Sequence, residues 1–215
     1  SEIIFRYLIS VVAMTIVYKV KDGLYVNMTN RCPCSCKFCI RGNGESAYGS
    51  DSLWLEREPS RREIVDAIES ANPPSYSEIV FCGYGEPTER FDDLVEIAGF
   101  LKNKYPSLPI RLNTNGLSDL IAGRPTARRL KGCIDVVSIS LNASTAERYC
   151  ELCRPRFGVE SYEAMLRFAS EVREFVPEVV MSMVSTSDTT ETEIASCRNI
   201  CDKLGLPLRV RTYIS

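Results

Sequence analysis

Four cysteines lie within eight residues, in the run Cys32-Pro33-Cys34-Ser35-Cys36-Lys37-Phe38-Cys39. Three of them, Cys32, Cys36 and Cys39, have the spacing C-x3-C-x2-C. Thiolates spaced in this way can bind three irons of a cubane iron–sulfur cluster and leave the fourth iron without a protein ligand. Thiolates also suit zinc, which would take Cys34 or a distant cysteine as its fourth ligand. The loop therefore predicts a metal centre, with zinc as the alternative to an iron–sulfur cluster.

A second candidate is the glycine-rich turn Gly83-Tyr84-Gly85-Glu86-Pro87. Glycines at a strand end let the backbone approach a ligand closely, because they carry no Cβ. The carboxylate of Glu86 can hold an ammonium group, and Pro87 stiffens the turn. Taken alone, this sequence is equally typical of an ordinary loop between a strand and a helix.

The chain contains no histidine among its 215 residues, but it contains 10 cysteines. The absence of imidazole excludes Ser/His/Asp and Cys/His nucleophilic sites and histidine-containing zinc hydrolase motifs. The formal net charge is -2, so no basic excess indicates a nucleic-acid surface. We find no export signal, and reduced thiols outside an oxidising compartment are more often metal ligands or catalytic groups than disulfide partners.

The elements that must position these motifs follow from the hydrophobic pattern. Alternating residues on either side of Asp22-Gly23 predict a tight β-hairpin. Ser60, Ser144 and Thr190, each followed three residues later by Glu, predict capping boxes at the starts of helices. Apolar runs separated by helical segments predict five further strands, at Glu78–Gly83, Ile110–Thr114, Val136–Asn142, Val179–Val184 and Leu208–Tyr213.

Strands that alternate with helices predict an α/β fold with a parallel sheet. Six parallel strands are fewer than the eight of a closed barrel, so we expect a partial (β/α)6 TIM-like barrel with an N-terminal β-hairpin, with a doubly wound sheet as the alternative. The expected organisation is one domain over residues 14–215, preceded by a possible extension at residues 1–13. The apolar stretch Ile3–Met14 is too short to cross a membrane, so no membrane contact is expected.

The cysteine loop and the glycine turn together, at the ends of the first and second parallel strands, resemble the radical S-adenosylmethionine (SAM) superfamily. In that family C-x3-C-x-aromatic-C binds a [4Fe–4S] cluster, and here Phe38 is the aromatic residue. The resemblance implies that Cys32, Cys36 and Cys39 ligate three irons and that SAM chelates the fourth. It also implies that Gly83, Tyr84, Gly85, Glu86 and Pro87 bind the SAM amino group, with Tyr84 in place of the more usual glycine.

The resemblance extends to the next two strand ends. Asn113, in Asn113-Thr114-Asn115-Gly116, and Ser140 and Asn142, in Ser138-Ile139-Ser140-Leu141-Asn142-Ala143, are expected to contact SAM. The chain is more narrowly similar to the small radical SAM proteins named for association with TatD-family nucleases. Four segments carry this similarity: Leu53–Pro59, Ser140–Ala143, Glu151–Gly158 and Arg209–Tyr213.

The implied reaction is reductive cleavage of SAM to methionine and a 5′-deoxyadenosyl radical, which abstracts hydrogen from an unknown substrate. No side chain is expected to act as an acid or base, because the cofactor supplies the bond-breaking power. The implied partners are an electron donor such as flavodoxin or ferredoxin and a peptide, protein or nucleotide substrate. The missing export signal and the oxygen-sensitive cluster predict a cytoplasmic location. The alternatives are an activase that forms a glycyl radical on a partner protein and a non-catalytic zinc or Fe–S module.

Several other residues have no assigned chemistry. The pairs Cys150/Cys153 and Cys197/Cys201 lie on predicted helices and could together hold zinc or a second cluster, but buried reduced cysteines are common. Cys82 and Cys133 are expected in the core, and Cys34 is not expected to be a ligand. Tyr48 and Trp54 could cover SAM or a substrate, although packing is the simpler role for both.

Overall fold

The computed structural model describes residues 14–44, 46 and 48–213. The expected extension at residues 1–13 lies outside the described residues. A seven-stranded sheet runs in chain order from β1 to β7. Its strands are β1 (Val17–Val20), β2 (Gly23–Val26), β3 (Glu78–Phe81), β4 (Ile110–Thr114), β5 (Val136–Ser140), β6 (Glu178–Ser185) and β7 (Leu208–Thr212).

The sheet has the connectivity that the sequence predicts. β1 pairs with β2 antiparallel, and each later strand pairs with the one before it in parallel. β1 and β7 are the two edges of the sheet. The predicted hairpin is confirmed, but its turn is Lys21-Asp22, because Val20 pairs with Gly23 and Gly23 already belongs to β2. Lys21 takes the left-handed conformation that this two-residue turn needs, with φ 53°.

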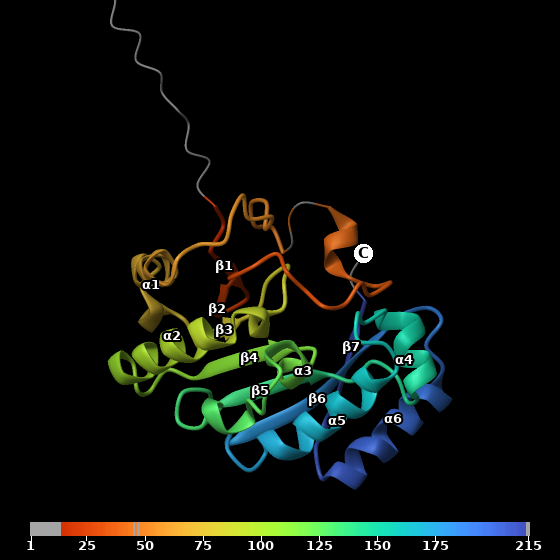
Figure 1. Ribbon diagram of the computed structural model, residues 1–215. Helices are drawn as coiled ribbons and strands as arrows, with labels where there is room; N and C mark the ends of the chain where they lie inside the picture. The colour runs from red at the N-terminus through yellow and green to blue at the C-terminus, as the bar shows by residue number, and fades with distance from the viewer. Residues whose placement is uncertain (1–13, 45, 47, 214–215) are drawn as a thin grey trace, which may run out of the picture.

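Helices connect the strands and cover the outer face of the curved sheet (Figure 1). Among the described residues none of them is long and apolar enough to cross a membrane. The α-helices are α1 (Arg61–Ser70), α2 (Phe91–Lys104), α3 (Ser118–Ala122), α4 (Ala146–Cys153), α5 (Glu160–Val172) and α6 (Glu191–Leu204). Short 3-10 helices are η1 (Ile40–Asn43), η2 (Pro73–Ser75), η3 (Pro87–Arg90) and η4 (Ala127–Leu130).

The two faces of the sheet differ in chemistry. The face covered by helices is apolar, since Leu24, Ile79 and Leu112 are buried there. The residues that alternate with these along each strand point to the inner face of the sheet. The parallel register aligns Asn113 with Ser138, and Ser140 with Ser182, so polar side chains line that inner face. The fold therefore has its hydrophobic core between the sheet and the helices and a polar interior that is free for ligands.

The three predicted capping boxes have different outcomes. Ser60 and Glu63 form a complete box at the start of α1. At α4 the cap is Thr145, one residue later than expected. Ser144 instead donates its backbone N–H (2.7 Å) and its hydroxyl (2.7 Å) to Glu193 of α6, so that Thr190 caps α6 without the returning Glu193 side chain. A long-range contact thus replaces local capping where two loops meet.

We expect Ser60→Ala to lower the free energy of unfolding by about 1 kcal/mol, because the exposed N–H of Glu63 loses its partner. Ser70→Ala, at the other end of the same helix, is the matched control and should change it by less than about 0.5 kcal/mol. Urea denaturation followed by circular dichroism measures both values. Equal losses in the two variants would contradict the role of the cap.

Candidate cofactor site

A cavity of about 310 Å³ lies where the loops that follow the parallel strands meet. It is lined by the cysteine loop, the glycine turn, and residues at the ends of β4, β5 and β7. Every residue that the sequence assigns to the site contributes to the lining: Cys32, Cys36, Phe38, Cys39, Gly83, Tyr84, Gly85, Glu86, Pro87, Asn113, Ser140 and Asn142. The structure therefore gathers the whole predicted set around one space.

The cysteine loop and the glycine turn are joined by their backbones. Pairing of β2 with β3 continues beyond the strand ends, since the N–H of Cys82 donates to the carbonyl of Val26 (3.1 Å). Further along, the N–H of Glu86 donates to the carbonyl of Arg31 (2.8 Å). The register of two neighbouring strands thus fixes the position of the cysteines relative to the turn.

The glycines of the turn are required by this contact. A Cβ on Gly85 would lie 2.1 Å from the carbonyl oxygen of Thr29, and one on Gly83 would lie 2.2 Å from Oδ1 of Asn27. The sequence predicts that these glycines let the backbone approach a ligand. In the structure the glycines let the backbone of the turn approach the segment that leads into the cysteine loop. The glycines are therefore needed for a contact within the chain.

Asn27 is a functional residue that the sequence analysis does not single out. Its side chain is fully buried and accepts a hydrogen bond from the N–H of Tyr84 (3.3 Å) while donating to the carbonyl of Leu53 (2.7 Å). Asn30 holds the same flanking segment by two bonds to the backbone of Leu55, of 2.7 and 3.1 Å. Two asparagines beside the cysteine loop thus anchor the segment around residues 53–55.

Tyr84, which replaces the more usual glycine, supports the outer wall of the site. Its ring packs edge-on against Trp54, with ring centroids 5.1 Å apart, and its hydroxyl donates to the carbonyl of Gly44 (2.9 Å). Trp54 does not contribute to the cavity lining, whereas Tyr48 does. Of the two aromatic residues considered as covers, Trp54 therefore packs on the turn and Tyr48 faces the cavity.

The other side of the cysteine loop is held by the end of α4. The N–H of Ser35 donates to the carbonyl of Cys153 (3.0 Å), and the N–H of Lys37 donates to that of Leu152 (2.9 Å). Beyond the helix, the N–H of Arg156 donates to the carbonyl of Pro33 (2.8 Å). These contacts join segments more than 110 residues apart in the chain, so no local pattern predicts them.

Two of the three expected ligands are stabilised as thiolates by neighbouring thiols. Hydrogen bonds from Cys153 and Cys34 lower the pKa of Cys36 to about 4. A hydrogen bond from Cys34 also lowers the pKa of Cys32. Hydrogen bonding to Cys32 and Cys36 correspondingly raises the pKa of Cys34, which is buried. The thiolate form is the one that binds iron, so the loop is electrostatically prepared for metal at Cys32 and Cys36.

Cys39 and Phe38 complete the loop. The guanidinium of Arg41 donates from Nε to Sγ of Cys39 (3.4 Å) and from Nη2 to the carbonyl of Cys34 (3.3 Å). Arg41 therefore places a positive charge beside the thiols. Phe38 is half-buried, packs against the core and lines the cavity.

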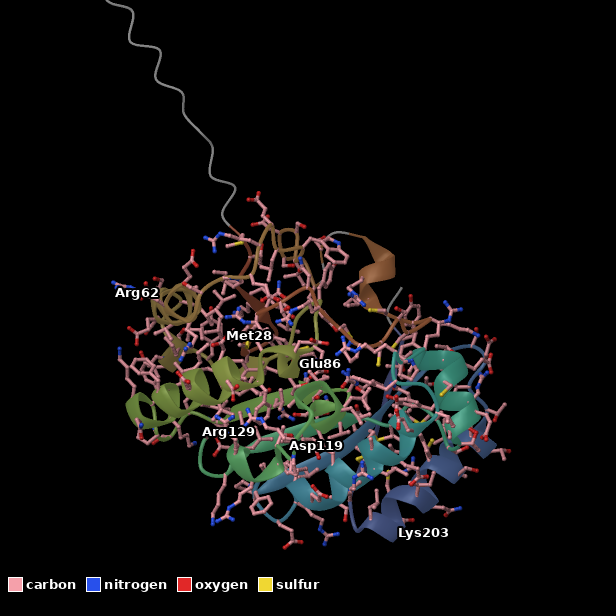
Figure 2. All side chains as sticks on the ribbon, viewed as in Figure 1. Met28, Arg62, Glu86, Asp119, Arg129 and Lys203 are labelled. Carbon is pink, nitrogen blue, oxygen red and sulfur yellow. The ribbon has the colours of Figure 1, made fainter. Side chains whose placement is uncertain are left out.

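Glu86 is a buried carboxylate, 5% exposed, between the ends of β3 and β4. Its Oε1 accepts bonds from the hydroxyls of Thr88 (2.8 Å) and Thr114 (2.7 Å), and its Oε2 accepts one from the N–H of Asn115 (2.8 Å). Burial raises its pKa, and these bonds oppose the rise. Figure 2 shows Glu86 inside the fold, whereas the labelled Arg62 and Lys203 lie at the periphery.

No lysine or arginine among the described residues forms an ion pair with Glu86. A buried carboxylate is normally paired, because removing a charge from water is costly. Here the carboxylate faces a cavity, and a ligand ammonium group would supply the missing cation. The carboxylate of Glu86 thus fits the amino group of SAM.

The next strand ends contribute amides and a hydroxyl. The side chain of Asn113 opposes the rise that burial causes in the pKa of Cys82, and Ser140 ends β5 at the cavity wall. Asn142 has a left-handed backbone, with φ 60°. Its side chain donates to Sγ of Cys153 (3.7 Å) and accepts from the N–H of Val184 (3.2 Å). Asn142 therefore joins β5, α4 and β6 in addition to facing the cavity.

Cys82 lies in the cavity wall, although the sequence suggests a core residue. The prediction is wrong because β3 ends at Phe81, so that Cys82 begins the turn. Cys133 is buried as predicted, and Cys197 and Cys201 are buried on α6. Cys153 lines the cavity, whereas Cys150 does not.

No three His, Cys, Asp or Glu side chains in the described part of the chain converge on a single metal ion. This holds for the two cysteine pairs on α4 and α6 and for the thiols of the loop. A cubane cluster is larger than one ion and holds its ligands farther apart. Three half-buried thiols that line one cavity next to the glycine turn fit such a cluster.

Comparison with known proteins identifies the family. The model of the Radical SAM superfamily matches residues 26–197, which include both motifs. A GTP 3′,8-cyclase of Paenarthrobacter nicotinovorans is 27% identical over 135 residues, covering 61% of this chain and 35% of the cyclase. The chain belongs to the radical SAM superfamily, whose members bind a [4Fe–4S] cluster and SAM.

Solved structures show the same fold. Streptococcus suis SuiB bound to precursor peptide SuiA superposes with a TM-score of 0.63 at 17% identity, over 92% of this chain and 40% of SuiB. Native anSMEcpe with bound AdoMet gives a TM-score of 0.60 at 18% identity, over 89% of this chain and 51% of that protein. The chain thus spans about half or less of the length of these relatives.

We expect Gly85→Ala to lower the free energy of unfolding by roughly 1–3 kcal/mol, because the added Cβ meets the fixed backbone of Thr29. The iron retained after anaerobic reconstitution should fall as well, since the cysteine loop is displaced. Gly99→Ala is the control. Its Cβ meets nothing within 4 Å in the middle of α2, so it should stabilise the helix by about 0.5–1 kcal/mol. Unchanged stability and iron content in Gly85→Ala would contradict the close contact.

Proposed function

We propose that Cys32, Cys36 and Cys39 bind a [4Fe–4S] cluster and that the chain is the core of an enzyme that cleaves SAM reductively. One observation carries the proposal. A single cavity is lined by three thiols spaced as in the family and by a buried carboxylate that has no cationic partner among the residues the structure describes. The first group suits a cluster with an open iron, and the second suits the ammonium group of the ligand that binds there.

When bound, the reduced cluster and SAM supply a 5′-deoxyadenosyl radical that abstracts hydrogen from the substrate. The chain's own residues orient and shield this chemistry. Glu86 holds the SAM ammonium group, and Thr88, Thr114 and Asn115 hold Glu86 in place. Asn113, Ser140 and Asn142 are proposed contacts of the rest of SAM. Phe38 and Tyr84 present apolar surface that excludes water from the site.

The proposed partners are an electron donor such as flavodoxin or ferredoxin and a substrate that enters at the open side of the sheet. SuiB has been solved with a precursor peptide, and the cyclase is named for GTP. Peptide and nucleotide substrates are therefore both within the range of similar proteins. We propose a cytoplasmic location because the cluster and the ten cysteines need reducing conditions.

We also propose that residues 14–215 form one radical SAM domain and that it belongs to the small group named for association with TatD-family nucleases. Four segments support this grouping: Leu53–Pro59, Ser140–Ala143, Glu151–Gly158 and Arg209–Tyr213. None of the relatives named above belongs to that group. The first segment is the one that Asn27 and Asn30 anchor beside the cysteine loop.

The second candidate function is activation of a partner protein by forming a glycyl radical, which an open side of the sheet would permit. An electron paramagnetic resonance signal of a glycyl radical after incubation with SAM, reductant and a glycyl-radical partner would support it. A non-catalytic zinc module is disfavoured, because the loop thiols do not converge on one ion and a structural site has no use for a buried unpaired carboxylate.

The decisive experiment is anaerobic reconstitution followed by incubation with SAM and a strong reductant. We expect about four irons and no zinc per chain, and formation of 5′-deoxyadenosine. Cys36→Ala should lose the cluster and the product, whereas Cys34→Ala should keep the iron. Iron analysis and chromatography of the product measure both. Equal iron loss in the two variants would contradict the ligand assignment.

Glu86→Gln tests the ammonium site. We expect the Kd of SAM to rise about tenfold or more, the size expected when a hydrogen bond to a charged group is lost. The matched ligand is 5′-methylthioadenosine, which lacks the amino group and should bind both proteins with similar affinity. Equilibrium dialysis measures the Kd of each of the two ligands for each of the two proteins. A parallel loss for both ligands would show that Glu86 only supports the fold.

A further inference from the structure

The cavity has a second charged group, which the cofactor assignment does not use. Among the described lining residues other than cysteines, Glu86 and Arg211 are the two with an acidic or a basic side chain. Glu86 lies between the ends of β3 and β4, whereas Arg211 lies on β7, at the opposite edge of the sheet from β1. The two opposite charges thus come from different strands of the sheet and line the same cavity, where both act on the thiol of Cys82.

Arg211 points to the inner face of the sheet. It pairs in register with Val184 of β6, which also lines the cavity. In a parallel pair, residues in register point to the same face of the sheet. Arg209 shares this parity but does not line the cavity. Arg211 is therefore the cation that the fold presents to whatever enters beside β7.

Within the described residues Arg211 has no acidic partner. Its recorded bond is a long one, 3.4 Å from Nη2 to the hydroxyl of Ser182. Some other arginines near the site are paired with carboxylates, for example Arg31 with Glu58 and Arg90 with Asp93, whereas Arg41 donates to Cys39 and to backbone carbonyls. A guanidinium offers five N–H donors in a plane that matches carboxylate and phosphate groups. Arg211 is exposed on the edge strand and contributes to the cavity lining, so the rest of this donor capacity is accessible to a ligand that enters there.

The surroundings of Arg211 are aromatic and polar. Burial raises the pKa of Tyr48, and the nearby Arg211 guanidinium opposes that rise. Burial also raises the pKa of Cys82; Asn113 and Arg211 oppose this rise, whereas Glu86 adds to it. Tyr18 of β1 also lines the cavity and donates its hydroxyl to the carbonyl of Cys82 (3.1 Å). Hydroxyl groups and a flat cation thus surround one space.

We propose that Arg211 is a specificity-determining residue that binds an oxyanion of the substrate, a carboxylate or a phosphate, next to the bound SAM. The inference rests on the proposed function, because it takes the Glu86 side of the cavity to be filled by SAM. Charge matching supports this division. The ammonium group of SAM is attracted to Glu86, and an anionic substrate is attracted to the only permanent cation of the lining.

The test uses reconstituted protein saturated with SAM and two aryl oxyanions, benzoate and phenyl phosphate, with neutral benzyl alcohol as the control ligand. Saturation-transfer NMR detects weak binding of such small probes. We expect Arg211→Gln to weaken the preferred oxyanion about tenfold or more and to leave benzyl alcohol unchanged. Arg167→Gln is the matched variant, because Arg167 is exposed on α5 and lies outside the cavity lining. It should bind all three probes like the natural protein.

The preferred probe identifies the source of the oxyanion. Tighter binding of phenyl phosphate indicates a phosphorylated substrate, and tighter binding of benzoate indicates a carboxylate. Equal oxyanion binding by Arg211→Gln and the natural protein would overturn the proposal. Binding of the probes to SAM-free protein but not to SAM-saturated protein would also overturn it, because Arg211 would then hold the cofactor. Formation of 5′-deoxyadenosine, measured on the same samples, reports separately on the proposed function.

Discussion

The site depends on a backbone contact that leaves no room for a side chain. Gly85 packs against the carbonyl of Thr29, and the next N–H, that of Glu86, bonds to the carbonyl of Arg31. Because β2 and β3 are hydrogen-bonded neighbours, this contact extends their register into the two loops that follow them. The thiols and the carboxylate are therefore placed by the sheet itself, and the loops do not need to find each other independently. The hydrogen bonds of Asn27 strengthen the same junction.

Electrostatics then distinguish the parts of the cavity. The cysteine loop concentrates thiols whose neighbours lower the pKa of Cys32 and Cys36, with Arg41 beside them. Glu86 is buried without a cation, although its bonds to Thr114 and Asn115 keep its position fixed. A protein interior normally favours the neutral form of an ionisable group, whereas the neighbours of Cys32 and Cys36 and the hydrogen bonds of Glu86 favour the charged form. Such opposition is expected where a protein binds a charged ligand and is hard to explain as a contribution to stability.

The sequence predicts the motifs and the strand order well, because both depend on local signals. The spacing of Cys32, Cys36 and Cys39 is visible within one loop, and β4 begins and ends where its apolar run does. Most of the missed features depend on partners far along the chain. Ser144 bonds to Glu193 and does not cap α4, and Cys153 holds the cysteine loop through its carbonyl. The glycines were located correctly, but only the structure shows that they accommodate Thr29 and Asn27.

The two sides of the cavity are built differently, and the difference favours cofactor binding on one side and substrate binding on the other. On the side of β3 to β5, two polar side chains are firmly bonded to the chain: Glu86 to Thr88, Thr114 and Asn115, and Asn142 to Cys153 and Val184. A site in which the positions are this strongly determined suits a ligand of fixed shape, such as a cofactor. On the side of β1 and β7, the lining comes from the edges of the sheet, and Arg211 makes only one long hydrogen bond. Edge strands can change without disturbing the strands between them. A common cofactor chemistry can therefore be combined with different substrates by altering the residues that face the cavity from β1 and β7.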